Sequence, residues 1–252
     1  MAKNTMRALG IDVGGSGVKG AVVNVRTGKL VSERFRLPTP SPPTTKALSR
    51  TVCRVVEHFA WKGPIGCGMP GPFIDGRLVT AVNLHTSWVG AKAEEIFSKA
   101  CGRKVSVIND ADAAGLAAMR FGAGRGKRGV VVLLTLGTGI GSAVFLDGKL
   151  LPNTEFGQME LRGKPAERRA AARVRKEKDL TWEEWGERLN EYVSALERLI
   201  WPDLIILGGG VSRKASRFIP LIKTRAPVVA ALLMNEAGII GAALASSRTV
   251  SS

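Results

Sequence analysis

The chain has 252 residues, 45% of them hydrophobic, which suits one large or two small domains and excludes a disordered protein. With no long apolar run and no visible signal peptide, it is expected to be cytoplasmic and to span no membrane. Its 37 Lys and Arg against 21 Asp and Glu give a net charge of +16, which favours a polyanionic partner; alternatively, the excess cations only keep the protein soluble.

The cysteines are Cys53, Cys67 and Cys101, and none belongs to a C-x-x-C pair. An odd number without that spacing argues against a disulfide framework and against a cysteine-rich zinc site. We therefore expect three small core residues and no structural zinc.

Strands and helices alternate along the predicted chain. Apolar runs indicate strands over residues 7–13, 18–25, 30–37 and 104–108, and helices over 45–61, 92–100 and 110–121. Prolines at 38, 40, 42 and 43 mark the loop before the first helix, which Thr44 or Thr45 can cap. A buried strand over 129–136, a Gly-rich turn, another strand and the tight turn Asp147-Gly148 follow. Helices over 166–176 and 181–201, a strand over 203–207 and a small-residue helix over 235–245 complete the pattern.

Two segments about half a chain apart share one plan. LGIDVGGSGVKGAVVNVRTGKLV and LLTLGTGIGSAVFLDGKLL each read as a buried strand, a Gly-rich turn, a second strand, a tight turn and Gly-Lys-Leu. This repeat predicts an α/β protein of two similar lobes with a ligand cleft between them, although two unrelated hairpins remain an alternative. We place one lobe at 1–108, with the C-terminal helix 236–252 packing back on it, and the other at 109–235.

The two Gly-rich turns predict phosphate binding. Neither is a P-loop, and neither fits the dinucleotide fingerprint, because a strand and not a helix follows each. Glycines let backbone N–H groups converge on an anion, and Ser16 and Thr138 add hydroxyl donors. Lys19 can meet a phosphate, and Asp12, at the end of the first strand, can hold a metal-bound water. The proposed phosphate contacts in these turns are Gly14, Gly15, Ser16, Gly17, Lys19, Gly137, Thr138 and Gly139.

The stretch VINDADAAG places carboxylates at the end of a strand. A carboxylate there must stay solvated, be capped or do chemistry. Asp110 is therefore a candidate catalytic carboxylate. Asp112 is interpreted as a carboxylate in the first turn of the following helix, where it favours the N-terminus.

The motifs IDVGGSGVKG, VINDADAAG, LTLGTGIGSA, EFGQMEL and IILGGGVSRK, in this order, resemble the ROK family of sugar kinases and repressors. Within that family they are most similar to the bacterial polyphosphate glucokinases. The resemblance implies the two-lobed, actin-like (ribonuclease-H-like) ATPase fold and a homodimer. The family's repressors carry a DNA-binding helix-turn-helix before the first strand; because a strand is predicted here from residue 7, we expect no DNA binding.

The resemblance also implies roles for single residues. In the resembling kinases the strand-end Asn-Asp pair, here Asn109 and Asp110, holds the sugar and supplies the general base. This role suits Asp110, because a sugar hydroxyl is a poor nucleophile until a positioned carboxylate accepts its proton. Asn109 offers a donor and an acceptor to neighbouring hydroxyls. Further sugar contacts carried over by position are Asn83, Glu155, Glu167 and Gly71, and the loop that lies near adenine in ATP-using members is matched by Gly209 and Gly210.

The chain also departs from the family pattern on the sugar side. Gln158 stands where the family has a His, and it can share hydrogen bonds but cannot ionise. GKPAE at 163–167 and LHTSW at 84–88 differ from the usual Gly-His-Asp-Ala-Glu and Val-Asp-Lys-Ser-Trp. The family's cysteine-rich zinc motif is absent from this region. His58 and His85, the only histidines, are not expected to be catalytic.

The resemblance implies a kinase that transfers a phosphoryl group from polyphosphate, ATP or both to the 6-hydroxyl of glucose, with Mg²⁺. Cations beside the second phosphate turn favour a track for a long polyanion over a merely solvated face. That track is predicted to comprise Arg168, Arg169, Arg173 and Arg175, with a second cluster at 120–128. The rivals are a kinase of another hexose, such as mannose or an N-acylated hexosamine, and a non-catalytic polyanion-binding relative whose sugar site has decayed.

Overall fold

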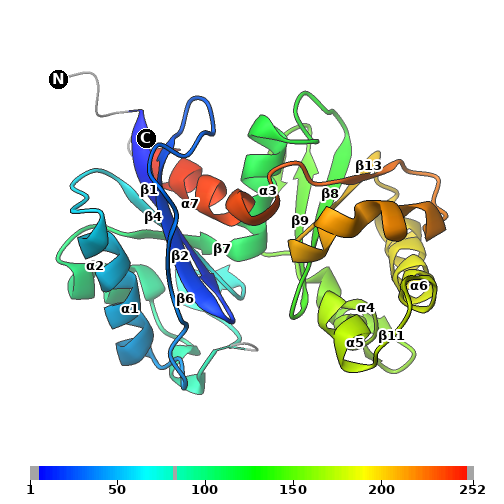
Figure 1. Ribbon diagram of the computed structural model, residues 1–252, viewed down its shortest axis with the longest axis horizontal. Coiled ribbons are helices and arrows are strands. Elements are labelled where there is room, and N and C mark those ends of the chain that lie inside the picture. The colour runs from blue at the N-terminus through cyan, green and yellow to red at the C-terminus, as the bar shows by residue number, and fades with distance from the viewer. Residues whose placement is uncertain (1–5, 82–83, 249–252) are drawn as a thin grey trace. The chain divides into compact units, whose positions relative to one another are not determined.

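The computed structural model describes residues 6–81 and 84–248 (Figure 1). The chain forms two compact units: the first is Met1–Ala117 with Glu236–Ser252, and the second is Ala118–Asn235. The sequence suggests a division after residue 108, whereas the units divide within helix α3 (Asp110–Phe121). The first turns of α3 belong to the first unit because they touch helix α7 (Ala237–Arg248): a Cβ on Gly241 would lie 1.6 Å from the carbonyl oxygen of Ala113.

A five-stranded sheet forms the centre of the first unit. Its order is β3-β2-β1-β4-β7. The strands are β1 (Arg7–Gly14), β2 (Gly17–Asn24), β3 (Phe35–Leu37), β4 (Ile65–Met69) and β7 (Ser106–Asn109). Strands β1, β2 and β3 are antiparallel neighbours, whereas β1, β4 and β7 run parallel. The carboxyl ends of β1, β4 and β7 therefore meet at one edge, with Asp12 paired to Gly68 and Met69 paired to Asn109.

Helices cover both faces of this sheet (Figure 1). Helix α1 (Thr45–His58) begins at the N-cap Thr44, whose side chain accepts the Ala47 N–H, as its sequence predicts. It packs its apolar side against β1, β2 and β3, while α2 (Ala93–Cys101) packs against α1 and β7. Leu9, Val52 and Phe97 belong to the core that these elements share. The expected core placement is confirmed for Cys53 and Cys67, which are buried, whereas Cys101 is half-buried.

Helix α7 crosses the other face at very short range. A Cβ on Gly10 of β1 would lie 1.9 Å from the carbonyl oxygen of Ile239, and one on Gly66 of β4 would lie 1.8 Å from that of Ala242. Neither glycine has a positive φ. Close approach of two backbones, and not backbone dihedral freedom, therefore requires glycine at both positions.

Replacing Gly66 by Ala should lower the free energy of unfolding by about 1–3 kcal/mol, the usual cost of forcing an extra methyl group into a packed core. Gly68→Ala in the same strand is the matched control, because its Cβ would meet neighbours at an ordinary 3.6 Å. Urea unfolding of the two variants gives the comparison. Equal stability losses would mean that the approach of α7 to β4 does not determine the residue at 66.

The second unit repeats this topology. Its sheet order is β10-β9-β8-β13-β14. The strands are β8 (Val130–Leu136), β9 (Ile140–Leu146), β10 (Lys149–Leu151), β13 (Leu204–Gly208) and β14 (Val228–Ala230). Strands β8, β9 and β10 are antiparallel neighbours, and β8, β13 and β14 run parallel. Order and direction match the first sheet strand for strand, so the repeat inferred from the two Gly-rich segments is confirmed.

One helix predicted in the second unit is broken. The single helix expected over 166–176 divides into α4 (Glu167–Ala170) and α5 (Ala172–Glu177), because Ala171 is extended with ψ 150°. The indole N–H of Trp185, on helix α6 (Trp182–Ile200), points at the carbonyl oxygens of Ala170 and Ala171, 3.1 and 3.3 Å away. These carbonyls thus have a tertiary donor, which sequence periodicity does not reveal.

The third predicted strand is also shorter than expected. Over 30–37 only Phe35–Leu37 forms β3, beside an isolated bridge between Val23 and Leu30. The hydroxyl of Ser32 accepts the Val22 N–H at 2.9 Å and so replaces a backbone partner. Short ladders pair β5 (Phe73–Ile74) with β6 (Arg77–Leu78), and β11 (Glu160–Leu161) with β12 (Lys164–Pro165). No helix of the described residues has both the length and the apolar character needed to cross a bilayer.

Candidate active site

The first Gly-rich turn closes the β1–β2 hairpin. The register ends with Gly14 opposite Gly17, so Gly15 and Ser16 form its exposed tip. Asp12 lies opposite Lys19 in this register. Most of the residues predicted to bind phosphate in this half of the chain are thus held in one short, well-defined turn.

Asp12 and Lys19 form an ion pair at the base of the turn. Lys19 Nζ lies 3.4 Å from Asp12 Oδ2, and the two side chains are 26% and 18% exposed. Burial raises the pKa of Asp12, and the charges of Lys19 and Arg34 oppose that shift. Gly238 of α7 leaves room for the carboxylate, since a Cβ there would lie 3.0 Å from Asp12 Cγ.

A Mg²⁺ ion in a phosphoryl-transfer site binds through one or two carboxylates together with substrate phosphates and water. No group of three His, Cys, Asp or Glu side chains suited to a metal gathers in residues 6–81 and 84–248. Asp12 is a single carboxylate at the base of a phosphate-type turn. Its chemistry fits an ion that the donor phosphates would hold and Asp12 would contact through water.

Asn109 joins two of the predicted sugar contacts. It is 4% exposed, and its Nδ2 donates to the carbonyl oxygen of Gly71 at 3.2 Å. Its Oδ1 accepts the N–H groups of Ala111 and Asp112 at 2.8 and 2.9 Å, which caps the first turn of α3. The oxygen expected to accept from a sugar is therefore occupied by the helix, while the amide nitrogen has a second N–H for a ligand.

Asp110 is the first residue of α3 and is half-buried. Its Oδ1 accepts the N–H of Ala111 at 2.8 Å. Asp112, expected to favour the N-terminus of the helix, does lie in the first turn of α3, where it is only 1% exposed. Its neighbours Ala111 and Ala113 are buried as well, because this end of α3 packs into the first unit. The predicted sugar contact Asn83 lies outside the described residues.

The second Gly-rich turn gathers several predicted contacts of the second unit. The N–H of Gly137 donates to the carbonyl oxygen of Gly139 at 2.9 Å, and Thr138 between them is exposed. Gly209 has φ +85°, and a Cβ there would lie 2.3 Å from the carbonyl oxygen of Leu136. The loop of Gly209 and Gly210 therefore packs directly against the start of the phosphate turn.

Glu167 binds the same turn from the start of α4. Its Oε2 accepts the N–H of Ile140 at 3.1 Å, and a Cβ on Gly139 would lie 2.4 Å from that oxygen. Its Oε1 accepts from Gln158 Nε2 at 3.0 Å. Burial, and after it the charge of Glu167, raises the pKa of Tyr192 on α6. Two predicted sugar contacts, Gln158 and Glu167, are thereby brought together beside the phosphate turn.

Glu155 precedes this pair as the N-cap residue of a short 3₁₀ helix, Phe156–Gln158. Its carbonyl oxygen accepts the N–H of Gln158 at 2.9 Å, and its side chain is half-buried. The hydroxyl of Ser142 on β9 accepts the N–H of Phe156 at 2.9 Å. The segment that carries Glu155 and Gln158 is thus tied to the sheet.

Gln158→His should change the Michaelis constant for the sugar and leave that for the phosphoryl donor unchanged. One neutral hydrogen bond contributes roughly 0.5–1.5 kcal/mol, so a shift of up to about tenfold is expected. Initial rates at varied sugar and at varied donor separate the two constants. Equal shifts in both constants, or no shift, would remove Gln158 from the sugar site.

Two of the four track arginines form strong internal contacts. Arg169 Nε lies 2.8 Å and Arg162 Nε 2.5 Å from the carboxylate of Glu191 on α6. Partial burial opposes ionisation of Glu191, but these two hydrogen bonds lower its pKa overall. Arg175 stacks over the ring of Trp182, with Cζ 3.9 Å from its centre. Sequence inspection missed Glu191 because it lies 22 residues beyond Arg169.

The other two track arginines are more available. Arg168 is exposed and forms no ion pair in the described residues. Arg173 Nε lies 3.5 Å from Glu177, an exposed i,i+4 pair of the kind that contributes little. The backbone N–H of Arg173 donates to the carbonyl oxygen of Gly137 at 3.0 Å. Helix α5 therefore begins directly at the second Gly-rich turn.

Both histidines make contacts within the fold. His58 stacks on Phe35 with ring centres 3.7 Å apart. His85 Nδ1 accepts the N–H of Ser87 at 3.1 Å and caps a short 3₁₀ helix.

Two units of one topology, each with a Gly-rich hairpin at its sheet, define a two-lobed α/β protein of the actin-like type. The model of the ROK family matches residues 8–157, and the chain belongs to that family. Its fold is the actin-like ATPase fold of the solved ROK sugar kinases.

Two relatives are similar over nearly the whole chain. Polyphosphate glucokinase of Mycobacterium tuberculosis is 50% identical over 97% of this chain and 93% of its own length. The polyphosphate glucokinase of Mycobacterium leprae is 48% identical over 97% of this chain and 76% of its own length.

Among solved structures, the inorganic polyphosphate/ATP-glucomannokinase of Arthrobacter sp. strain KM superposes with a TM-score of 0.94 at 43% identity, covering 96% of this chain and 99% of that one. A ROK family glucokinase of Streptomyces griseus, solved with glucose and AMPPNP, has a TM-score of 0.82 at 24% identity, covering 96% and 99%. This second likeness supports the fold alone.

Proposed function

We propose that this chain transfers the terminal phosphoryl group of inorganic polyphosphate, or of ATP, to the 6-hydroxyl of glucose. The observation that carries the polyphosphate donor is the bond from the Arg173 N–H to Gly137. It places the start of a basic helix on a phosphate-type turn, so a chain of phosphates bound at the turn can continue along cations. The relatives at 50% and 43% identity, named for polyphosphate, support the same donor.

The reaction needs a base, a grip on the donor and neutralisation of its charge. Asp110 takes the proton of the sugar hydroxyl as its oxygen attacks the terminal phosphorus. The bridging P–O bond breaks, and the leaving group is a polyphosphate shortened by one unit, or ADP. The Gly-rich turns bind phosphate oxygens with backbone N–H groups, and Lys19 adds a charge. Asp12 would hold a Mg²⁺ ion through water together with the donor phosphates, and that ion would neutralise phosphate charge.

The sugar contacts of this proposal are Asn109, Gly71, Glu155, Gln158, Glu167 and Asn83. Glu167 and Gln158 support it by their mutual bond beside the second turn, and Asn109 by its bond to Gly71. We further propose that the enzyme works as a cytoplasmic homodimer. Size-exclusion chromatography with light scattering tests the dimer.

Mannose is a second candidate sugar. Gln158 departs from the usual His on the sugar side, and a structure that is 43% identical belongs to a glucomannokinase. A kinase that accepts both hexoses would phosphorylate the same 6-hydroxyl with the same base. The N-acylated hexosamines have no comparable support.

The test is a coupled assay for hexose 6-phosphate, with glucose and mannose as acceptors and with long-chain polyphosphate and ATP as donors in separate reactions. We expect glucose 6-phosphate with polyphosphate. If hexose 6-phosphate forms with ATP but not with polyphosphate, polyphosphate is rejected as the donor. No product from any pair, while polyphosphate still binds, would favour the non-catalytic polyanion-binding relative.

A further inference from the structure

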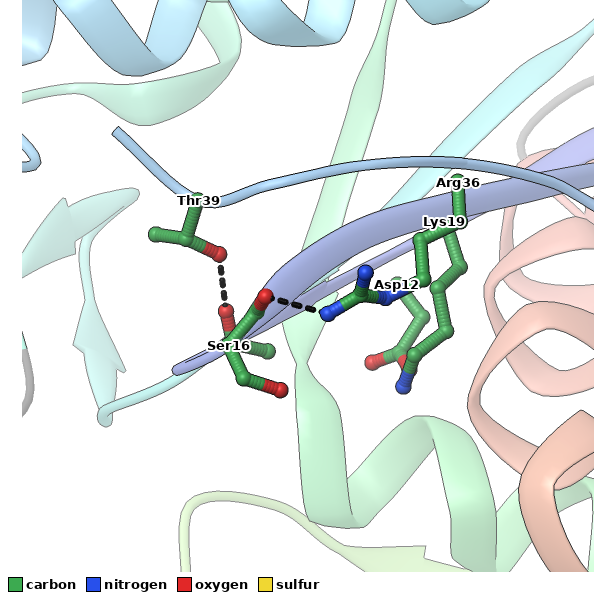
Figure 2. A network of polar contacts seen from close by, with 6 residues as sticks. Asp12, Ser16, Lys19, Arg36 and Thr39 are labelled. Atoms are coloured by element: carbon green, nitrogen blue, oxygen red, sulfur yellow. Dashed lines mark hydrogen bonds and ion pairs between the residues drawn. The ribbon is translucent and has the colours of Figure 1, made fainter.

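The first Gly-rich turn is held from outside by the segment that follows β2. Thr39 Oγ1 donates to the carbonyl oxygen of Gly14 at 2.5 Å, and the Arg36 guanidinium donates to that of Ser16 at 2.6 Å (Figure 2). Both partners are far along the chain, 25 and 20 residues away. Two consecutive parts of the turn thus depend on side chains that belong to no known phosphate motif.

Fixing these carbonyl groups also fixes N–H groups. A trans peptide is planar, and its C=O and N–H point in opposite directions. The Thr39 bond therefore sets the direction of the Gly15 N–H, and the Arg36 bond sets that of the Gly17 N–H. Of these two groups, the Gly15 N–H lies at the exposed tip of the turn, where a phosphate could use it as a donor.

Arg36 also lies where a phosphate chain would pass. Its guanidinium crosses Gly17, where a Cβ would be 2.6 Å from its Nε, so a side chain at position 17 would displace Arg36. The residue is exposed, and among the described residues its guanidinium makes only the hydrogen bond to Ser16. Because a guanidinium carries several N–H donors, most of them remain for a ligand.

The neighbouring charges favour an anion. Arg36 is the register partner of Lys19 across β2 and β3, and Arg34 acts on the same carboxylate, Asp12. Figure 2 shows Arg36, Lys19 and Asp12 side by side at the turn. The charges of Lys19 and Arg34 thus act on one carboxylate, and Arg36 adds a third cation beside Lys19, so the site is net positive.

We propose that Arg36 is a donor-binding residue: one N–H holds the phosphate turn through Ser16, and the others bind a phosphate of the donor beside Lys19. Thr39 is a positioning residue that acts only through the turn. The inference rests on the proposed function in one respect, namely that the ligand of this turn is a phosphate chain. Arg is suited to this role because its planar fork binds phosphate through paired hydrogen bonds.

The first experiment measures binding without turnover. Titration calorimetry with long-chain polyphosphate, in the absence of sugar, compares wild type, Arg36→Gln and Arg26→Gln. Arg26 is an exposed arginine at the opposite end of β2, roughly 25 Å from the turn at about 3.3 Å per residue, and so loses the same charge elsewhere. We expect a dissociation constant raised about 10- to 100-fold for Arg36→Gln, and about the wild-type value for Arg26→Gln.

The second experiment separates direct contact from positioning. Thr39→Val removes the hydroxyl without changing charge, and Thr39→Ser restores it. We expect Thr39→Val to weaken polyphosphate binding by about 2- to 10-fold with an unchanged salt dependence, and Thr39→Ser to recover it. Arg36→Gln should in addition flatten the log–log salt dependence by about one contact, and Arg36→Lys should recover that slope but only part of the affinity.

Suppose that Arg36→Gln and Thr39→Val lose similar affinity for polyphosphate and keep the same log–log salt dependence. Arg36 would then only position the turn, and the proposal would be overturned. Unchanged binding in Arg36→Gln overturns it as well. A different result would separate the two proposals. If the wild-type protein binds polyphosphate through Arg36 but phosphorylates no hexose, this inference stands and the proposed function is rejected. Thermal melting of each variant tests whether the substitution leaves the fold intact.

Discussion

Asp110→Asn should lower the turnover number by about 10²–10⁴-fold, the usual contribution of a general base. Asparagine has the same size and can still accept the Ala111 N–H that Asp110 Oδ1 accepts at 2.8 Å. The cap of α3 belongs to Asn109, whose two hydrogen bonds the substitution does not touch. The variant should therefore fold normally and fail only where a proton must be accepted.

The measurement is the turnover number for hexose 6-phosphate at saturating sugar and polyphosphate. Asp179→Asn is the matched control: it removes a carboxylate from an exposed position with φ +46°, a conformation that asparagine tolerates. The control should keep the wild-type rate. Near-normal turnover in Asp110→Asn would remove this carboxylate from the mechanism. Polyphosphate binding should be the same in both variants.

Much of this site was predictable because its signals are local. The strand-end sequence Asn109-Asp110 carries the N-cap preference of asparagine, and α3 does begin there. The two Gly-rich hairpins follow from a strand, a turn and a strand within about twenty residues each. Hydrophobic periodicity and turn residues act over such short distances along the chain, so the repeated strand–turn–strand unit could be predicted from the sequence.

Strand β4 shows what local signals do not reveal. IGCGM has two glycines in five residues and was not predicted as a strand. Gly66 is required because the backbone of Ala242 on α7 crosses it. The two residues are 176 positions apart in the chain (242 − 66). Glycine is unfavourable in a strand interior, so local propensity opposes what tertiary packing demands here.

The anchors of the first turn were hidden for the same reason. Arg36 and Thr39 reach Ser16 and Gly14 only because β3 pairs with β2 in a fixed register. Neither lies in a recognisable motif, and their bonds go to backbone atoms that have no sequence signature. Sequence therefore identified the phosphate turn but not the side chains that hold it.

Contacts within the arginine cluster change how the polyphosphate track should be tested. Arg169 holds Glu191, and Arg175 stacks on Trp182, so replacing either one disturbs packing around α6. Arg168 and Arg173 are exposed and make, at most, a weak pair with Glu177. The informative variant is therefore the double substitution Arg168→Gln with Arg173→Gln, and not the removal of all four arginines.

The double variant should have a Michaelis constant for long polyphosphate about tenfold higher than that of wild type. Each lost exposed ion pair with a phosphate is expected to cost about 0.5–1 kcal/mol of binding free energy. The variant's log–log salt dependence should be flatter by about two contacts, taking the value of about −0.9 per phosphate contact in duplex DNA as the guide to size. The constant for ATP, whose three phosphates end near the turn, should rise less. The constant for glucose should stay near that of wild type.

A salt titration of initial rates, with long-chain polyphosphate and with ATP, measures both effects. Lys149→Gln serves as the control, because Lys149 is exposed beyond the far end of β9, roughly 23 Å from the second Gly-rich turn at about 3.3 Å per residue. If the control flattens the slope as much as the double variant does, the effect is one of net charge. If both donors respond alike in the double variant, the cations on α4 and α5 are a solvated surface. A steep polyphosphate dependence that only the double variant loses, with ATP little affected, is the result that a track starting at Gly137 requires.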